Sequence, residues 1–393
     1  MTKGNEMTDD PTVPSIDDLA LADPEQSTEA REEEEKRFAA SQWVLMWRKF
    51  RNNRAAIAGG AVILALYLMA VLAPFLAPYG AHTRMTTFIW APPQRVHLFD
   101  GARLRPWVAG LQRELDPQTL RRMYIPDTTV RHPVRFFVHG EPYRLLGLIP
   151  TDVHLFGVDD PAMGVFVLGT DRQGRDMLSR IVLGSQISLT VGLIGVLLSL
   201  LIGTVLGIAS GYYGGWTDNV MQRVIEFIRS FPSVPLWMAL SAALPAHWPP
   251  LRTYFAITLI LSLVGWTWLA RQLRGRVLAL RDSEYVVAAQ LMGAKDGRIL
   301  FRHLLPSVFG HVIVIATLSM PSMILAETTL SFLGLGIRPP LTSWGVLLEE
   351  CQNLESVAHA PWLLLPAAFI AATVLAFNFM GDGLRDASDP YTV

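Results

Sequence analysis

The sequence predicts an all-α membrane protein with six transmembrane helices and a small β-containing extracytoplasmic insert between the first two of them. Of its 393 residues, 51% are apolar and only 17% are charged, whereas a soluble domain carries about 25% charged residues. Charged residues are concentrated in the first 54 residues, near 80–180 and near 271–302, and long apolar runs fill the remainder. This distribution excludes a single soluble globule and indicates several membrane crossings.

Composition and motifs also exclude several functions. The net charge of −1 offers no electrostatic basis for nucleic-acid binding, and a single cysteine, Cys351, excludes an intrachain disulfide. The sequence has no phosphate-binding G-x-x-x-x-G-K-[ST], no H-E-x-x-H, no G-x-S-x-G, and no histidine pair at metal-ligand spacing. We therefore expect no catalytic residue, no metal site and no cofactor bound by this chain.

The N-terminal region combines an acidic tail with an amphipathic segment. Residues 1–30 are expected to be disordered, because acidic residues alternate with prolines and large apolar residues are few. Residues 31–54 are expected to form an interfacial helix, since Trp43, Trp47 and Phe50 fall on one helical face. Basic residues lie close to these aromatic residues: Arg48, Lys49, Arg51 and Arg54.

The membrane-spanning segments are predicted from apolar runs. The first lies within 55–79, and a core of five further runs lies within 187–382. These five runs are approximately 187–208, 231–244, 254–269, 308–330 and 362–379. The run at 231–244 is short, and we expect the charged segment 218–230 to form a helix that leaves the cytoplasmic surface and continues into it.

Basic residues predict the orientation. The segment 271–302 contains seven Lys or Arg residues against three Asp or Glu residues, and the flank before the first span is also basic. By the positive-inside rule, both termini and the loop 281–306 are cytoplasmic, and 383–393 is a cytoplasmic tail. The expected location is the cell inner (plasma) membrane, with several passes.

The segment 80–186 is predicted to be an extracytoplasmic insert. It is far longer than an ordinary loop, which indicates a small domain or a functional element. Two β-rich stretches, 134–138 and 143–148, flank a Gly- and Pro-containing sequence at 139–142, so a hairpin with its turn there is expected. Thr170 and Asp171 are expected to cap the helix that continues into the second span.

The most informative stretch is 282–306. A short helix is expected to present Tyr285, Ala288, Ala289 and Met292 on one face and to end at Gly293. Such a helix can sit in a groove of a partner protein, and a solvated or re-entrant loop is the alternative. The residues expected to take part in docking are Tyr285, Ala288, Ala289, Met292, Gly293, Arg298, His303 and Pro306.

This stretch resembles the EAA loop of binding-protein-dependent ABC importer permeases. Its residues match at the positions of the two alanines, the glycine and the final L-P, whereas Val287 replaces the acidic residue. L-G-T-D-x-x-G-R-D-x-x-S-R at 168–180, E-x-x-L-S-F-L-G-L-G at 327–336 and G-L-R-D at 383–386 resemble the dipeptide, oligopeptide and nickel type. Within that type, the chain is similar to the "C" permease.

The resemblance implies a fold, partners and a function. The fold would be the six-helix importer permease, and 281–306 would hold the coupling helix that contacts a cytoplasmic ATPase. The implied partners are a second permease subunit (as a heterodimer), two ATPase subunits that bind ATP and Mg, a solute-binding protein and membrane lipid. The chain would be non-catalytic and form half of a pathway for peptides. Oligosaccharides, opines or nickel chelates are alternative cargoes, and an ion-gradient-driven transporter or a membrane enzyme is an alternative class.

Three residues inside the apolar runs are candidates for the translocation pathway or for structure. Glu327 is ionisable, and such residues in a membrane span usually face the bundle interior and mark function. We favour a buried strut that orders the following loop, with Thr328, Thr329 and Ser331 as local partners. Trp266 and Trp268 are interpreted as residues of the helix interface rather than as substrate contacts.

Overall fold

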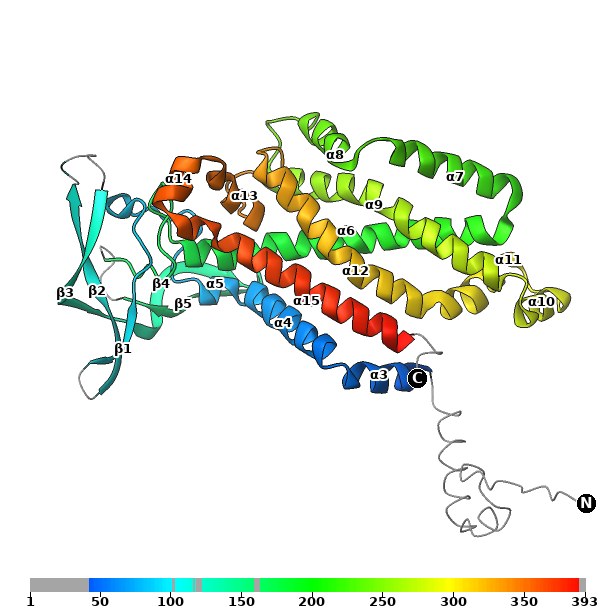
Figure 1. Ribbon diagram of the computed structural model, residues 1–393, viewed down its shortest axis with the longest axis horizontal. Helices are drawn as coiled ribbons and strands as arrows, with labels where there is room; N and C mark the ends of the chain where they lie inside the picture. The colour runs from blue at the N-terminus through cyan, green and yellow to red at the C-terminus, as the bar shows by residue number, and fades with distance from the viewer. Residues whose placement is uncertain (1–41, 101–102, 116, 118–121, 159–162, 389–393) are drawn as a thin grey trace, which may run out of the picture.

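Long helices lie side by side along the molecule, with strands gathered at one end (Figure 1). The computed structural model describes residues 42–100, 103–115, 117, 122–158 and 163–388. The acidic tail predicted at 1–30, the start of the segment 31–54 and the end of the tail 383–393 lie outside the described residues.

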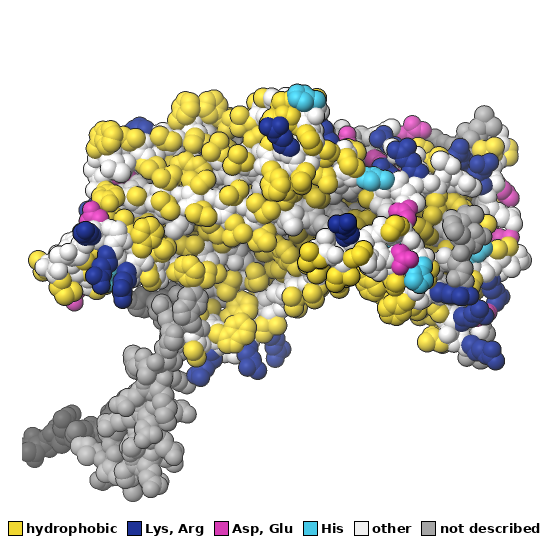
Figure 2. Space-filling model, turned by 180° about the vertical axis from the view of Figure 1, so that it is seen from behind, with side chains coloured by type: hydrophobic (Ala, Val, Ile, Leu, Met, Phe, Trp, Pro, Cys, Tyr) yellow, Lys and Arg dark blue, Asp and Glu magenta, His cyan; other side chains and the backbone are white. Residues whose placement is uncertain are grey.

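Five helical segments of the described chain are long and apolar enough to cross a membrane. Apolar side chains cover the middle of the molecule, and charged side chains and histidines gather mostly toward its two ends (Figure 2). The five segments are α4 (Arg54–Val71), α6 (Met177–Tyr213), α9 (Pro250–Leu280), Asp296–Phe332 with α12 (Leu305–Phe332), and Pro361–Ser388 with α15 (Leu365–Ser388).

The sequence predicts that the helix at 218–230 continues without a break into the apolar run 231–244. The structure has two helices there instead. They are α7 (Gly215–Ser230) and α8 (Ser233–Ala242), separated by Phe231 and Pro232. Proline lacks an N–H donor and disfavours helical dihedrals in the residue before it. Phe231 is accordingly extended, with φ −85° and ψ 134°. The two helices follow one another beside α9, from its α10 end toward the strand end (Figure 1).

The segment before the first span is helical over α3 (Gln42–Asn52). Trp47 is exposed and its ring stacks on Phe50 at a centroid distance of 5.9 Å. The side chain of Asn53 then accepts a hydrogen bond from the Ala56 amide at 3.1 Å and caps α4. A bend at this cap therefore separates α3 from the spanning helix.

The strands form two antiparallel units. One is a sheet in the order β1 (Val96–Asp100), β2 (Arg103–Leu115), β3 (Arg122–Pro133), and the other is the hairpin β4 (Arg135–Leu145) and β5 (Ile149–Gly157). The predicted hairpin is wrong, because the stretches 134–138 and 143–148 fall largely within the single strand β4, on either side of 139–142. That sequence forms an irregularity within β4, and the chain reverses at Leu146 and Gly147, which both have positive φ.

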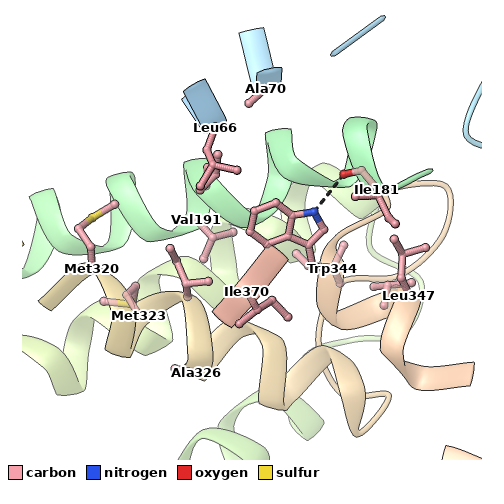
Figure 3. Close-up of a cluster of buried hydrophobic side chains, with 14 of the residues drawn as sticks. Leu66, Ala70, Ile181, Val191, Met320, Met323, Ala326, Trp344, Leu347 and Ile370 are labelled. Carbon is pink, nitrogen blue, oxygen red and sulfur yellow. Dashed lines mark hydrogen bonds between the residues drawn. The ribbon is translucent and has the colours of Figure 1, made fainter. Parts of the chain in front are cut away.

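Short helices complete the strand end of the bundle. They are α5 (Ala73–Leu76), η1 (Thr86–Phe88), α13 (Trp344–Glu349), η3 (Glu350–Gln352), α14 (Leu354–His359) and η4 (Pro361–Leu364). Trp344 of α13 is fully buried among side chains of α4, α6, α12 and α15 (Figure 3). Its Nε1 donates to the carbonyl oxygen of Ile181 at 3.0 Å, so the indole is both buried and satisfied.

A buried charged network links the start of α6 to η3. The carboxylate of Asp171 accepts from Arg175 Nε at 2.5 Å and from Arg180, and Arg175 Nη2 also donates to Glu350 Oε1 at 3.1 Å. The predicted cap at Thr170 and Asp171 is wrong, because Asp176 caps α6 by accepting from the Ser179 amide at 2.7 Å. Asp171 instead organises the loop that precedes the helix.

The helices α6 and α9 touch through glycines. A Cβ atom at Gly207 would lie 2.7 Å from the backbone oxygen of Ala270, and one at Gly203 would lie 2.8 Å from a methyl carbon of Leu269. Real Cβ atoms essentially never come that close, so these two positions require glycine for close helix contact.

We predict that Gly207→Ala forces α6 and α9 apart. Overpacking of this kind costs about 1–3 kcal/mol, so the variant should unfold at a lower temperature than wild type when heated in detergent. Gly275→Ala is the matched control, since a Cβ there meets nothing within 4 Å. Equal unfolding temperatures for the two variants would contradict the contact.

Candidate functional site

A short helix projects from the end of the bundle that lies opposite the strands (Figure 1). This helix, α10 (Glu284–Leu291), follows α9 and precedes α11 (Asp296–Ile299). A π-helical turn, Leu300–Leu304, then leads into α12. The predicted docking loop 281–306 is therefore a helical projection whose two ends continue into long helices.

One face of α10 is buried against the bundle. Val286 is 0% exposed and Ala289 is 2% exposed. Both belong to an apolar cluster contributed by α9, α11, the π-helical turn and α12: Leu273, Val277, Ile299, Leu304 and Val308. Ala289, which the sequence places on one face with Tyr285, Ala288 and Met292, thus points into the molecule, whereas those three are exposed.

The other face of α10 ends in an exposed apolar tip. Leu291 is 85% exposed and Met292 is 81% exposed, and Val287 and Ala288 beside them are also exposed. Large apolar side chains that stand this far out mark a protein contact more often than a solvated loop. We call Val287, Ala288, Leu291 and Met292 the α10 tip.

Gly293 gives the helix its sharp end. Its φ is +77°, which side chains rarely adopt, and the Gly293 amide donates to the Gln290 carbonyl oxygen at 2.9 Å. The Ala294 amide donates to the Ala289 carbonyl oxygen at 3.0 Å, which completes a Schellman motif. The chain therefore turns back to the bundle directly after Met292.

Two tyrosines tie α10 to its neighbours. Tyr212, at the end of α6, donates to Asp296 Oδ1 at 3.1 Å and accepts from Gln290 Nε2 at 3.5 Å. The hydroxyl of Tyr285 lies 3.3 Å from the Ser307 hydroxyl of α12 and can donate to it. Sequence reasoning missed Tyr212, because nothing in the chain order places the end of α6 beside 290–296.

The other predicted docking residues lie at the base of the projection. Arg298 is exposed on α11, and His303 is half-buried in the π-helical turn. Pro306 is exposed in the first turn of α12, directly after the π-helical turn. Val287, at the position of the family's acidic residue, is part of the α10 tip.

An ion pair fixes α7 to α9 near this end. Arg274 Nε donates to Asp218 Oδ1 at 2.5 Å, and Arg274 Nη2 donates to Asp218 Oδ2, so the pair is bidentate. The hydroxyl of Ser210 also donates to Asp218, at 2.6 Å.

Glu327 lies far from α10 and is fully buried. Its Oε1 accepts from Ser331 and from Ser343, each at 2.7 Å, and its Oε2 accepts from Ser188 at 3.4 Å. The carboxylate thereby joins α6, α12 and the start of α13. Of the local partners expected from the sequence, Ser331 bonds to it, and Ser188 and Ser343 come from distant segments.

The two candidate tryptophans of α9 have different surroundings. Trp266 is buried with Ile225 of α7 and Ala270. Trp268 is exposed on the opposite side of the helix. Among the described residues, no group of three His, Cys, Asp or Glu side chains is placed to hold a metal ion.

Two parts of the chain match known protein families. Residues 203–392 match the family described as binding-protein-dependent transport system inner membrane component. Residues 41–93 match the N-terminal transmembrane domain of oligopeptide transport permease C.

Three relatives illustrate the similarity. The chain is 40% identical to the oligopeptide transport system permease protein OppC of Bacillus subtilis over 60% of this chain and 75% of the relative. It is 33% identical to the dipeptide transport system permease protein DppC of the same organism, over 88% of this chain and 84% of the relative. It is 44% identical to OppC of Escherichia coli K12, over 56% and 71%.

We predict that Gly293→Ala loosens the projection without a steric clash. A Cβ at this position meets nothing within 4 Å, but the left-handed conformation costs about 1–2 kcal/mol for a side chain. Amides of 284–300 should exchange with solvent about 5–30 times faster. Gly297→Ala, which also has free space and no positive φ, should leave exchange unchanged.

The Asp218–Arg274 pair predicts that the start of α7 is held beside α9. Asp218→Asn removes the carboxylate that accepts both hydrogen bonds from Arg274. Spin labels at Asn219 and Gly275 should therefore lie farther apart in this variant than in the wild type. An unchanged distance would contradict the role of the pair.

Proposed function

Because the chain belongs to the family of binding-protein-dependent transport system inner membrane components, we propose that it is a permease subunit of an ATP-driven importer of peptides. The observation that carries the mechanism is the α10 tip, which is exposed to a partner while the opposite face of its helix is buried in the bundle. The peptide cargo follows from the relatives, which are named as oligopeptide and dipeptide permeases.

The proposed arrangement in the membrane has six crossings. Five are the long helices, and the remaining one is made by α7 and α8 together. With 16 and 10 residues, they extend about 39 Å at 1.5 Å per residue, enough for a hydrocarbon core of about 30 Å. Both termini and α10 then lie in the cytoplasm, with the basic α3, and the strands are extracytoplasmic.

The proposed partners supply the chemistry. Two ATPase subunits would bind ATP and Mg and contact the α10 tip from the cytoplasm. A second, related permease would complete the pathway, and a solute-binding protein would deliver cargo to the strand end. This chain would make and break no covalent bond.

Coupling would proceed by rigid-body movement. Closure of the ATPases around ATP would displace α10, and the buried contacts of Val286 and Ala289 prevent α10 from moving independently of the cluster behind it. Tyr212 extends the connection to α6, and Tyr285 extends it to α12. The long helices would thus shift with α10 and alternate the pathway between its inward- and outward-open forms.

We predict that Met292→Asp disconnects the ATPases. A buried charge without a partner weakens an apolar interface by about 2 kcal/mol or more, which is at least 30-fold in affinity. The ATPase subunits should no longer co-purify with the variant, and peptide uptake should be lost while membrane insertion is normal.

The matched control is Leu354→Asp. Leu354 is as exposed as Met292, at 81%, but lies on α14 at the opposite end of the bundle. This variant should retain the ATPases. Retention of the ATPases by Met292→Asp as well would refute docking at the α10 tip.

A further inference from the structure

An open cavity of about 320 Å³ lies where the strand region meets the bundle. Its walls come from five separate segments: α5 with the residues directly after it, β4, β5, α6 and the loop before α13. Most of them are apolar, including Pro74, Ala77, Leu183, Ile187 and Leu341. The volume is in the range of small-molecule sites.

One carboxylate lines this cavity. Glu141 Oε1 accepts a hydrogen bond from the Thr83 hydroxyl at 2.5 Å, and Oε2 is turned toward Gly80, 2.3 Å from where a Cβ would lie. The cavity lining contains no Lys or Arg, and no ion pair to Glu141 is found among the described residues. Within the described parts of the chain, this exposed carboxylate thus has no cationic partner and lies beside an apolar surface.

The backbone that carries Glu141 is fixed by a buried histidine. His154 of β5 places Nδ1 at 2.6 Å from the carbonyl oxygen of Ala77 and Nε2 at 3.1 Å from that of Glu141. The ring therefore bridges the end of α5 and the irregular part of β4. This irregularity, where the sequence predicts a turn, is what brings Glu141 to the cavity.

We propose that this junction cavity binds a primary ammonium group carried on a compact apolar body, with the Glu141 carboxylate as its counter-ion. A charge-assisted hydrogen bond would hold the ammonium, and the apolar wall would hold the adjoining carbon atoms. Gln186 also lines the cavity, and its side chain carries an amide oxygen that can accept from the same group.

Two sources carry this chemistry at the outer end of a membrane span. One is the amino terminus of a small peptide, a source that rests on the proposed transport of peptides. The other is the headgroup of an ethanolamine phospholipid. Acetylation removes the charge from the amino terminus of the peptide. The composition of the bilayer controls whether the ethanolamine headgroup is present.

The test uses the purified permease–ATPase complex, without solute-binding protein, in nanodiscs of phosphatidylglycerol. Binding of phenylalanyl-alanine and of its N-acetyl form is measured by calorimetry. The free amine should bind at least tenfold more tightly, and Glu141→Gln should remove that difference. Glu349→Gln, an exposed carboxylate outside the cavity, should have no effect. Gly80→Ala should weaken binding with the charge retained, because its Cβ displaces the carboxylate.

Addition of phosphatidylethanolamine separates the sources. The site is assigned to the headgroup if this lipid competes with the dipeptide for the wild type. The same assignment follows if native mass spectrometry shows that retention of the lipid depends on Glu141. Dipeptide binding that is insensitive to the lipid assigns it to the peptide. The proposal is overturned if neither ligand depends on Glu141. Failure of the complete importer to take up any peptide would refute the proposed cargo, while lipid binding dependent on Glu141 would stand.

Discussion

The close contact between α6 and α9 is the constraint on which the arrangement of the molecule depends. Gly203 and Gly207 bring the two backbones together, so neither helix can shift without the other. At one end α6 carries the charged network of Asp171 and Arg180, and at the other it carries Tyr212. In the proposed mechanism, a displacement of α10 would therefore be transmitted along a single stiff element to the region of the strands.

Buried polar groups hold the other helices to this element. Glu327 joins α12 to α6 and to the start of α13 through three serine hydroxyls. Loss of one partner of a buried carboxylate costs more than the bond itself is worth, because the remaining charge stays desolvated. Such networks favour one geometry over many.

The elements that depend on local composition could be predicted from the sequence. The long apolar runs, the short helix near 285 and its end at Gly293 follow from length, spacing and glycine placement. Features that depend on tertiary contact could not be predicted. Nothing in the sequence showed that Ala289 would be buried while Met292 is exposed, since both fit one helical face.

The errors have related causes. The sequence at 139–142 contains good turn residues, yet pairing between β4 and β5 continues past it and makes it an irregularity. Residues 231–232 were expected to continue a helix into the apolar run. Pro232 disfavours a helical conformation of Phe231, and the helix ends there. Tyr212 and Glu141 act at sites assembled from distant segments, which periodicity does not show.

The break between α7 and α8 has a consequence for the surroundings of the third crossing. Around Phe231 and Pro232 the regular pattern of backbone hydrogen bonds is interrupted. Hydrocarbon does not tolerate backbone groups outside a helix, whereas protein and water do. In the proposed six-crossing arrangement the lipid-facing perimeter would therefore exclude this junction, which would face the proposed second permease or the proposed transport pathway.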